Sequence, residues 1–255
     1  MNNKIIRKKL LLRRITTIFL FFILFVLWTY YYFMQSDFFE LREVLVSGNS
    51  IIEENVVVKL SELEFGRNIL KYNLTNIENS ISTHPYVKNV NVRRKLFNTI
   101  IIDITERLEY AIIIYMGSNI YIDKDAKILK ADDSYFKQNL PLITSVELLD
   151  FSVGEYLVLS NENKLERALQ IIQAAKATEI INLISEISLR EENIRIITVD
   201  GIEVIVSETE CPVYMMLALE EILSELESIN RKNVIVDMRN DGVVTVRERD
   251  VQEED

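Results

Sequence analysis

The sequence is poor in the residues that cross-link, bend or break a chain. Cys211 is the only cysteine, so no intramolecular disulfide can form and the fold must hold by its core alone. The 255 residues include six glycines and three prolines, and no Ser/Gly-rich or Pro-rich stretch separates the segments. Neighbouring domains are therefore expected to abut instead of being joined by a flexible linker.

Residues for catalysis are equally scarce. His84, the only histidine, precedes Pro85 where a predicted helix ends, a position typical of a capping or surface residue. Cys211 has no histidine near it in the sequence, and we expect it to be a small, partly buried thiol. One imidazole among carboxylates is a poor zinc site, and neither a phosphate-binding glycine loop nor a G-x-S-x-G elbow occurs. The sequence thus predicts a protein that is not an enzyme, with no cofactor and no small-molecule substrate.

Carboxylates are abundant, and two of them could in principle hydrolyse a glycosidic bond in cell-wall glycan. Many of the acidic residues lie at predicted caps, turns or polar helix faces, where a solvent-exposed carboxylate is expected. They are Glu53, Glu191, Glu192, Glu220, Glu221, Glu225 and Glu227. A carboxylate-dependent cell-wall hydrolase stays open as the less favoured alternative.

The longest apolar run, Ile15 to Phe33, lies in a stretch that has no charge between Arg14 and Asp37. As a helix rising about 1.5 Å per residue it spans roughly 30 Å, the thickness of a bilayer's hydrocarbon core. A cleaved secretory signal would need small residues after a shorter apolar core, and no alanine occurs before Ala111. We predict an uncleaved transmembrane helix over residues 15–36.

The flanks of this run predict its orientation. Residues 1–14 carry six positive charges and no negative one, so the positive-inside rule keeps this tail in the cytoplasm and the bulk of the chain outside. Since the whole chain carries −10, the exported part carries −16, which disfavours nucleic acid and anionic lipid head groups as its partners. The last eight residues, 248–255, lack apolar periodicity and predict a disordered acidic tail.

Residues 37–108 show a strand, helix, helix, strand, strand pattern. A strand from Phe39 to Val46 is followed by the turn Ser47-Gly48-Asn49 and by a capping box, Ser50 to Glu53, that would begin a helix running to about Leu63. A second helix, Asn73 to Ser82, precedes strands at Val87 to Arg94 and Thr99 to Arg107, where Ile100, Ile102 and Ile104 share one apolar face.

Residues 109–247 alternate strands with two amphipathic helices. Strands are predicted at Ala111 to Met116, Ile120 to Ile122, Ala126 to Leu129, Ile184 to Leu189, Ile194 to Val199, Ile202 to Val206, Asn233 to Met238 and Val243 to Arg247. The helices are expected from about Ser160 to Ala177 and from Pro212, with Met215, Leu219, Ile222, Leu226 and Ile229 on the apolar face of the second. Asp241-Gly242 is a hairpin signal between the last two strands.

Several sequence segments, in the order in which they occur, resemble those of one family. LREVLVSGN, GRNILKYN, HPYVKNVNVRRK and IIIDITER, within residues 41–107, are similar to the POTRA domain of the bacterial division proteins FtsQ and DivIB, and YIDKDAKIL, LPLIT and IVDMRNDGVVTV resemble its second, mainly β domain. The chain departs from the family at Leu96-Phe97-Asn98, where a proline is usual, at Ala126, where glycine is common, and at Asn240, where an aromatic residue is frequent. The third departure weakens the carry-over of a partner contact.

The resemblance implies an α+β fold with one transmembrane helix, a POTRA domain (37–108) and an FtsQ-type β domain (109–247). It also implies a cell-division scaffold at the septum that positions other divisome proteins, among them the single-span proteins FtsB and FtsL, or DivIC in some lineages. The final strand has no element after it and is expected at a sheet edge that could accept a partner's strand. The candidate partner-binding residues are Arg239, Asn240, Val243, Val244, Thr245, Val246 and Arg247.

Two alternatives stay open beside the scaffold. The edge strand could pair with nothing, protected by Arg247, Glu248 and Arg249. A POTRA-type chaperone in protein secretion or envelope assembly is the other alternative function.

Overall fold

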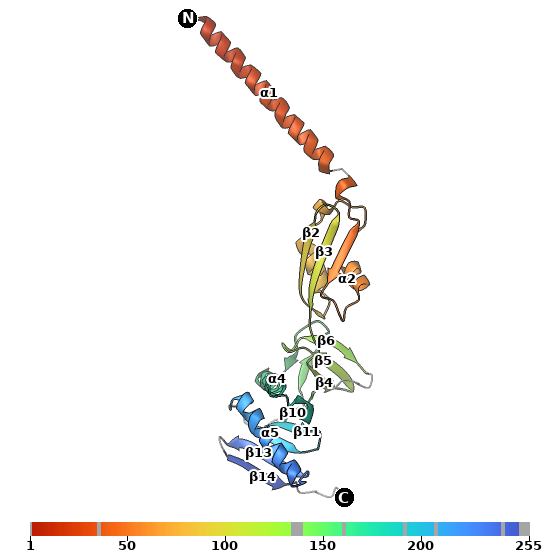
Figure 1. Cartoon of the computed structure of the whole chain (residues 1–255), viewed down its shortest axis with the longest axis vertical. Helices are drawn as coiled ribbons and strands as arrows, with labels where there is room; N and C mark the ends of the chain where they lie inside the picture. The colour runs from red at the N-terminus through yellow and green to blue at the C-terminus, as the bar shows by residue number, and fades with distance from the viewer. Residues whose placement is uncertain are drawn as a thin grey trace. The chain divides into compact units, whose positions relative to one another are not determined.

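The computed structural model describes residues 2–34, 37–133, 140–159, 162–190, 193–206, 209–240 and 243–249. The chain divides into two compact units, each described by itself below (Figure 1). The first comprises Met1–Thr83 and Val87–Glu106, and the second comprises His84–Tyr86 and Arg107–Asp255. Outside the described residues lie the predicted turn at Asp241-Gly242, the surface residues Glu191 and Glu192, and residues 250–255 of the predicted tail. The prediction that this tail begins at residue 248 is wrong, because Glu248 ends the last strand and the amide of Arg249 donates to the carbonyl of Asn233 at 3.1 Å.

The first unit begins with one long helix, α1 (Asn2–Met34). Within it, the 21 residues Arg13–Phe33 are long and apolar enough to cross a membrane, and none of this stretch is buried inside the protein. A long apolar helix that the rest of the described chain does not bury is typical of a membrane span.

A three-stranded sheet covered by two helices completes the first unit. The strand order is β1-β3-β2, with β1 (Glu43–Ser47) parallel to β3 (Thr99–Glu106) and β2 (Val87–Lys95) antiparallel to it. The helices are α2 (Glu54–Leu60) and α3 (Leu74–Ser82), and short 3-10 turns lie at Asp37–Phe39 and Ile69–Lys71. Ile100, Ile102 and Ile104 are buried, so the predicted apolar face of β3 is confirmed.

Two predictions in this unit are wrong. The first strand begins at Glu43, four residues after the expected Phe39, because residues 37–39 form a 3-10 turn and Phe39 is buried there. The capping box does not form, since Glu53 is itself the N-cap of α2 and makes no side-chain capping bond. Instead the carboxylate of Glu106 accepts hydrogen bonds from the amides of Ser50, Ile51 and Ile52 at 2.7–3.0 Å.

A nine-stranded mixed sheet forms the second unit, in the order β14-β13-β12-β11-β10-β7-β4-β5-β6. Its strands are β4 (Ala111–Tyr115), β5 (Ser118–Ile122), β6 (Ile128–Asp132), β7 (Leu142–Thr144), β10 (Ile184–Leu189), β11 (Ile194–Thr198), β12 (Glu203–Val206), β13 (Val234–Asn240) and β14 (Val243–Glu248). A two-stranded sheet, β8 (Leu148–Asp150) with β9 (Val158–Leu159), accompanies it. The short strands β7, β8 and β9 were not predicted, because two or three residues cannot show an alternating pattern.

Two helices complete the core of the second unit (Figure 1). They are α4 (Glu162–Ala177) and α5 (Pro212–Ser228), which pack against each other. Proline opens α5 as predicted, and Met215, Leu219 and Leu226 are buried, whereas Ile229 lies beyond the end of the helix and is exposed. The helix α5 connects the parallel neighbours β12 and β13, which places the C-terminal hairpin β13-β14 at one end of the sheet.

Candidate functional site

Strand β14 lies at the edge of the nine-stranded sheet, where β13 is its one neighbour among the described residues (Figure 1). All six of its residues are exposed. The opposite edge differs, since the segment after β8 covers part of it. There the amide of Ile128 donates to the carbonyl of Glu155 at 2.9 Å, and the amide of Gly154 donates to the carbonyl of Ile128 at 2.9 Å. Of the two edges, β14 therefore presents the more open main chain.

The direction of the amides along β14 follows from the hydrogen bond at its end. The amide of Arg249 donates to the carbonyl of Asn233 at 3.1 Å. Alternate residues of an antiparallel strand point their main-chain groups the same way. Thr245 and Arg247 therefore share this direction toward β13, and the main-chain groups that point away from the sheet belong to Val244, Val246 and Glu248.

The side chains of this strand are unusually apolar for an exposed edge. Val243, Val244 and Val246 are 60%, 41% and 37% exposed. Proteins commonly protect such edges with charges, and here the charged residues follow the valines. Arg247 and Glu248, the charged residues of β14, follow Val243, Val244 and Val246 along the strand, and Glu248 pairs with Arg231 at 3.2 Å.

A buried ion network holds the end of this hairpin to the sheet. Glu203 of β12 is 5% exposed and binds Arg195 of the neighbouring strand and Arg249 after β14, the latter at 2.7 Å. Burial raises the pKa of the Glu203 carboxyl, but the hydrogen bond from Arg195 and the charges of Arg195 and Arg249 outweigh burial and leave that pKa below its ordinary value. The network fixes β14 in register while leaving its outer side open.

Arg239 and Asn240 end strand β13 beside the valines, and both are exposed. Arg239 donates from Nη2 and Nε to the carboxylate of Asp237 at 2.6–3.2 Å. This hydrogen bond and the adjacent positive charge lower the pKa of Asp237. The pair spans a β-bulge, where the register shifts between Asp237 and Asn240, so the guanidinium is held along the strand.

The predicted residues thus come together on one hairpin. Arg239 and Asn240 lie on β13, and Val243, Val244, Thr245, Val246 and Arg247 lie on the edge strand. Sequence reasoning missed Glu203 and Arg195, which support the hairpin from β12 and β11. A glutamate among Ile202, Val204, Ile205 and Val206 was the signal that could have revealed a buried carboxylate with a cationic partner.

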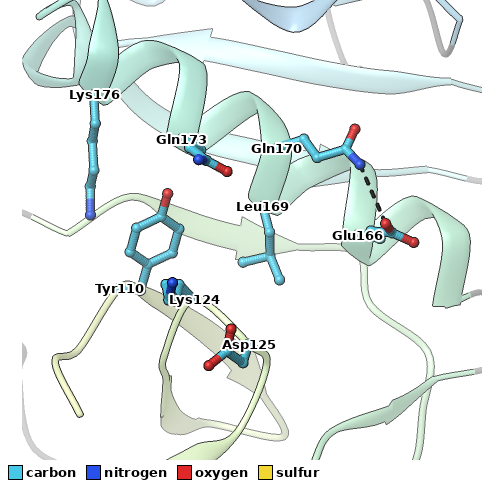
Figure 2. A pocket seen from close by; sticks show the side chains of 8 residues that line it. All are labelled: Tyr110, Lys124, Asp125, Glu166, Leu169, Gln170, Gln173 and Lys176. Carbon is cyan, nitrogen blue, oxygen red and sulfur yellow. Dashed lines mark hydrogen bonds between the residues drawn. The ribbon is translucent and has the colours of Figure 1, made fainter. Parts of the chain in front are cut away.

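A separate cleft of about 400 Å³ lies between α4 and the start of β4 (Figure 2). The side chain of Lys176 reaches from α4 to the ring of Tyr110, with Nζ 3.7 Å from the ring centroid, and burial lowers the pKa of this lysine. Two carboxylates also line the cleft. Asp125 accepts from Arg107 at 3.4 Å, and Glu166 accepts from Gln170 at 3.4 Å. The cleft offers hydrogen-bonding groups of both charges without a histidine, cysteine or serine in its lining.

His84 and Cys211 occupy turn positions. Nδ1 of His84 accepts a hydrogen bond from the amide of Tyr86 at 3.3 Å, which agrees with the predicted role at a helix end. The prediction of a partly buried thiol is wrong: Cys211 is exposed, because it is the N-cap residue of α5 and lies outside the packed face of that helix. Among the described residues, no three His, Cys, Asp or Glu side chains are grouped as a metal site would require.

Comparison with known families covers both units. The family described as "POTRA domain, FtsQ-type" matches residues 39–107, and "Cell division protein FtsQ/DivIB, C-terminal" matches residues 111–239, half of the chain. The chain belongs to the FtsQ/DivIB family. The β14 strand lies just beyond the second matched range, so the edge itself is described by the structure and not by the family match.

Known FtsQ and DivIB proteins match a large part of the chain. The cell division protein DivIB of Clostridium acetobutylicum is 31% identical over 64% of this chain and 60% of its own length. The DivIB of Clostridium tetani is 30% identical over 46% of this chain and 44% of its own length, and the FtsQ of Syntrophotalea carbinolica is 26% identical over 60% of this chain and 54% of its own length. The matches therefore span between about two fifths and three fifths of these FtsQ/DivIB relatives.

Among solved structures, the major extracytoplasmic domain of DivIB from Geobacillus stearothermophilus is similar to part of the chain. The similarity covers 50% of this chain and 97% of that domain, with 13% identity and a TM-score of 0.31.

Proposed function

We propose that this FtsQ/DivIB protein is a membrane-anchored scaffold of the division machinery. One span, residues 15–36, holds it in the cytoplasmic membrane with the basic tail, residues 1–14, inside. The rest of the chain lies outside, where it binds and positions other division proteins at the septum. It does so without chemistry of its own, through main-chain pairing. The span, the charge asymmetry around it and the family membership support this reading.

The observation that carries the proposal is the open edge of β14. Its outward main-chain groups, at Val244, Val246 and Glu248, can accept a strand from a partner, and the exposed valines can contact the side chains of that strand. An edge of this kind costs a protein solubility unless it is used, which favours a binding role over an edge that pairs with nothing.

The partners that fit this mode are other single-span division proteins of the FtsB and FtsL kind, DivIC-like in some lineages. A partner tethered in the same membrane gains effective concentration from its own anchor, so a short paired strand can suffice for binding. The Asp237-Arg239 pair lies next to the edge and can select the charge of the partner's flanking residues.

Binding of the full-length chain in lipid nanodiscs to the extracytoplasmic segment of such a partner tests the proposal. We expect binding by the unmodified chain and its loss in Val244→Pro, because proline removes an outward amide. Val244→Thr is the matched control, since it keeps the amide and a β-branched side chain, and it should bind as the unmodified chain does. Equal binding by all three proteins would exclude edge pairing.

A further inference from the structure

The end of the first unit's sheet nearest the span carries a patch of exposed apolar side chains. Phe38 is 53% exposed, Leu96 63% and Phe97 47%. The rings of Phe38 and Phe97 lie 4.5 Å apart between centroids, so two segments distant in sequence meet in one patch. Phe65, on a loop whose Gly66 amide donates to the carbonyl of Leu41, adds a fourth exposed apolar side chain at this end of the sheet.

The buried side of the patch is anchored in the domain. Phe39 is 3% exposed, and its ring centroid lies 5.6 Å from that of Phe38 and 6.0 Å from that of Phe97. The loop that carries Leu96 and Phe97 is held to the first strand, because the carbonyl of Asn98 accepts from the amide of Arg42 at 2.9 Å. The patch is therefore presented on a supported surface and cannot fold into the core.

Chain length keeps this patch close to the bilayer. The span helix ends at Met34, and four residues of any conformation reach at most about 14 Å, so Phe38 cannot move farther than that from the helix end. The apolar span itself ends at Phe33. An apolar patch tethered at this distance lies within reach of the boundary between head groups and acyl chains.

The charges around the patch do not select an anionic surface. Arg42 and Lys95 are exposed beside it, and so are Asp37 and Glu43. Since positive and negative charges are both present, electrostatic attraction to anionic head groups is not expected to drive membrane binding by this patch. Burial of apolar area in lipid is the stabilisation that the patch can obtain, at about 25 cal/mol per Å².

On these grounds we propose that Phe38, Leu96 and Phe97 insert into the outer boundary of the bilayer and form a second membrane contact of the first unit, beside the span. This contact rests on the membrane anchoring in the proposed function. It would orient the domain's sheet with its Asn98 end toward the membrane and its Glu106 end away from it.

The chain contains a matched control at the far end of the same sheet. Ile51 is 47% exposed and apolar, and its amide binds Glu106 at the end of β3, while Asn98 precedes the start of that strand. Eight residues of strand separate Asn98 from Glu106, or about 26 Å. Ile51 is therefore about as exposed as the patch residues, but it lies at the opposite end of the sheet.

Fluorescence quenching in vesicles of neutral phosphatidylcholine tests the proposal with the full-length chain. Cys211→Ser removes the native thiol, and Leu96→Cys or Ile51→Cys then places an environment-sensitive fluorophore at either end of the sheet. Lipids with a nitroxide on the acyl chain quench fluorophores that enter the bilayer. Trp28, the only tryptophan, lies in the span and reports anchoring in the same sample.

We expect quenching of Trp28 and of the Leu96 label, a blue shift of the Leu96 label's emission, and neither change at Ile51. If Trp28 is quenched while the Leu96 label is not, the anchor stands and the second contact is excluded. Equal quenching of both labels would also overturn it, because the whole domain and not the patch would then meet the lipid. An unquenched Trp28 would remove the anchor and, with it, the contact.

Discussion

At the scale of single residues, Gly48 has the strictest requirement in the first unit. It adopts φ +79°, and a Cβ atom there would overlap the carbonyl oxygen of Ile104. Gly66 in the same unit has φ +82° and open space around its Cα. The two glycines separate the cost of a positive φ from the cost of a steric overlap.

We therefore expect Gly48→Ala to destabilise the first unit by about 3 kcal/mol or more, and Gly66→Ala by about 1 kcal/mol. Chemical unfolding followed by circular dichroism measures both. Similar losses for the two variants would show that the contact with Ile104 relaxes without cost.

Ala126 adopts φ 62°, in the left-handed region that favours glycine. Two hydrogen bonds hold the backbone in this conformation: the amide of Ala126 donates to the carbonyl of Asp123 at 3.1 Å, and the carbonyl of Ala126 accepts from the amide of Leu157 at 2.9 Å. Ala126→Gly should stabilise the second unit by about 0.5–1 kcal/mol, since relief of strain exceeds the added entropy of the unfolded chain. A lower melting temperature for this variant would contradict the assignment.

Glu203 gives the second unit a pH dependence of defined sign. Its pKa is lowered in the folded state, so its network stabilises the fold above the ordinary glutamate pKa of about 4.3, and that stabilisation is lost as the pH falls through the lowered value. At pH 7, Glu203→Gln should cost about 1–3 kcal/mol, because two partly exposed arginines lose their counter-ion.

The free energy of unfolding measured between pH 7 and pH 3 checks this prediction. The difference between the unmodified chain and Glu203→Gln should shrink as the pH falls below about 4.3. A difference that stays constant with pH would assign the role of Glu203 to packing alone.

At the scale of elements, the alternating direction of the amides along β14 predicts different results for proline substitutions at two neighbouring positions. Val244→Pro should cost less than about 1 kcal/mol, since its amide points away from the sheet, whereas Thr245→Pro should cost about 3 kcal/mol through the lost bond to β13. Hydrogen exchange of the β13 amides measures the effect. Loss of protection in both variants would mean that the direction assigned to the amides is wrong.

Elements with a clear repeat could be predicted from the sequence, and those that depend on distant groups could not. The alternation of Ile100, Ile102 and Ile104 and the proline that opens α5 are local signals, and both predictions are confirmed. The capping box failed because Glu106, more than fifty residues away, binds the amide of Ser50 that Glu53 was expected to satisfy, together with the amides of Ile51 and Ile52. Similarly, the burial of Glu203 depends on Arg195 and Arg249, which only the sheet brings together.

At the scale of the whole molecule, the family and the α+β architecture could be predicted because phrases spread over both units keep their order. The openness of the β14 edge required the structure. The alternation of residues in a strand does not show which strand borders it, and only the sheet order shows that β13 is the one neighbour of β14 among the described residues and that the opposite edge is partly covered. The proposal of a binding function at that edge therefore depends on both the structure and the family membership.

Replacement of the chromosomal copy by single variants, followed by microscopy of cell length, tests this account most directly. Cells that carry Val244→Thr should septate normally, and cells that carry Val244→Pro should grow as unseparated filaments with the protein present at its usual level in the membrane. Normal septation with Val244→Pro at that level would contradict the claim that this protein acts in division through the open main chain of its last strand.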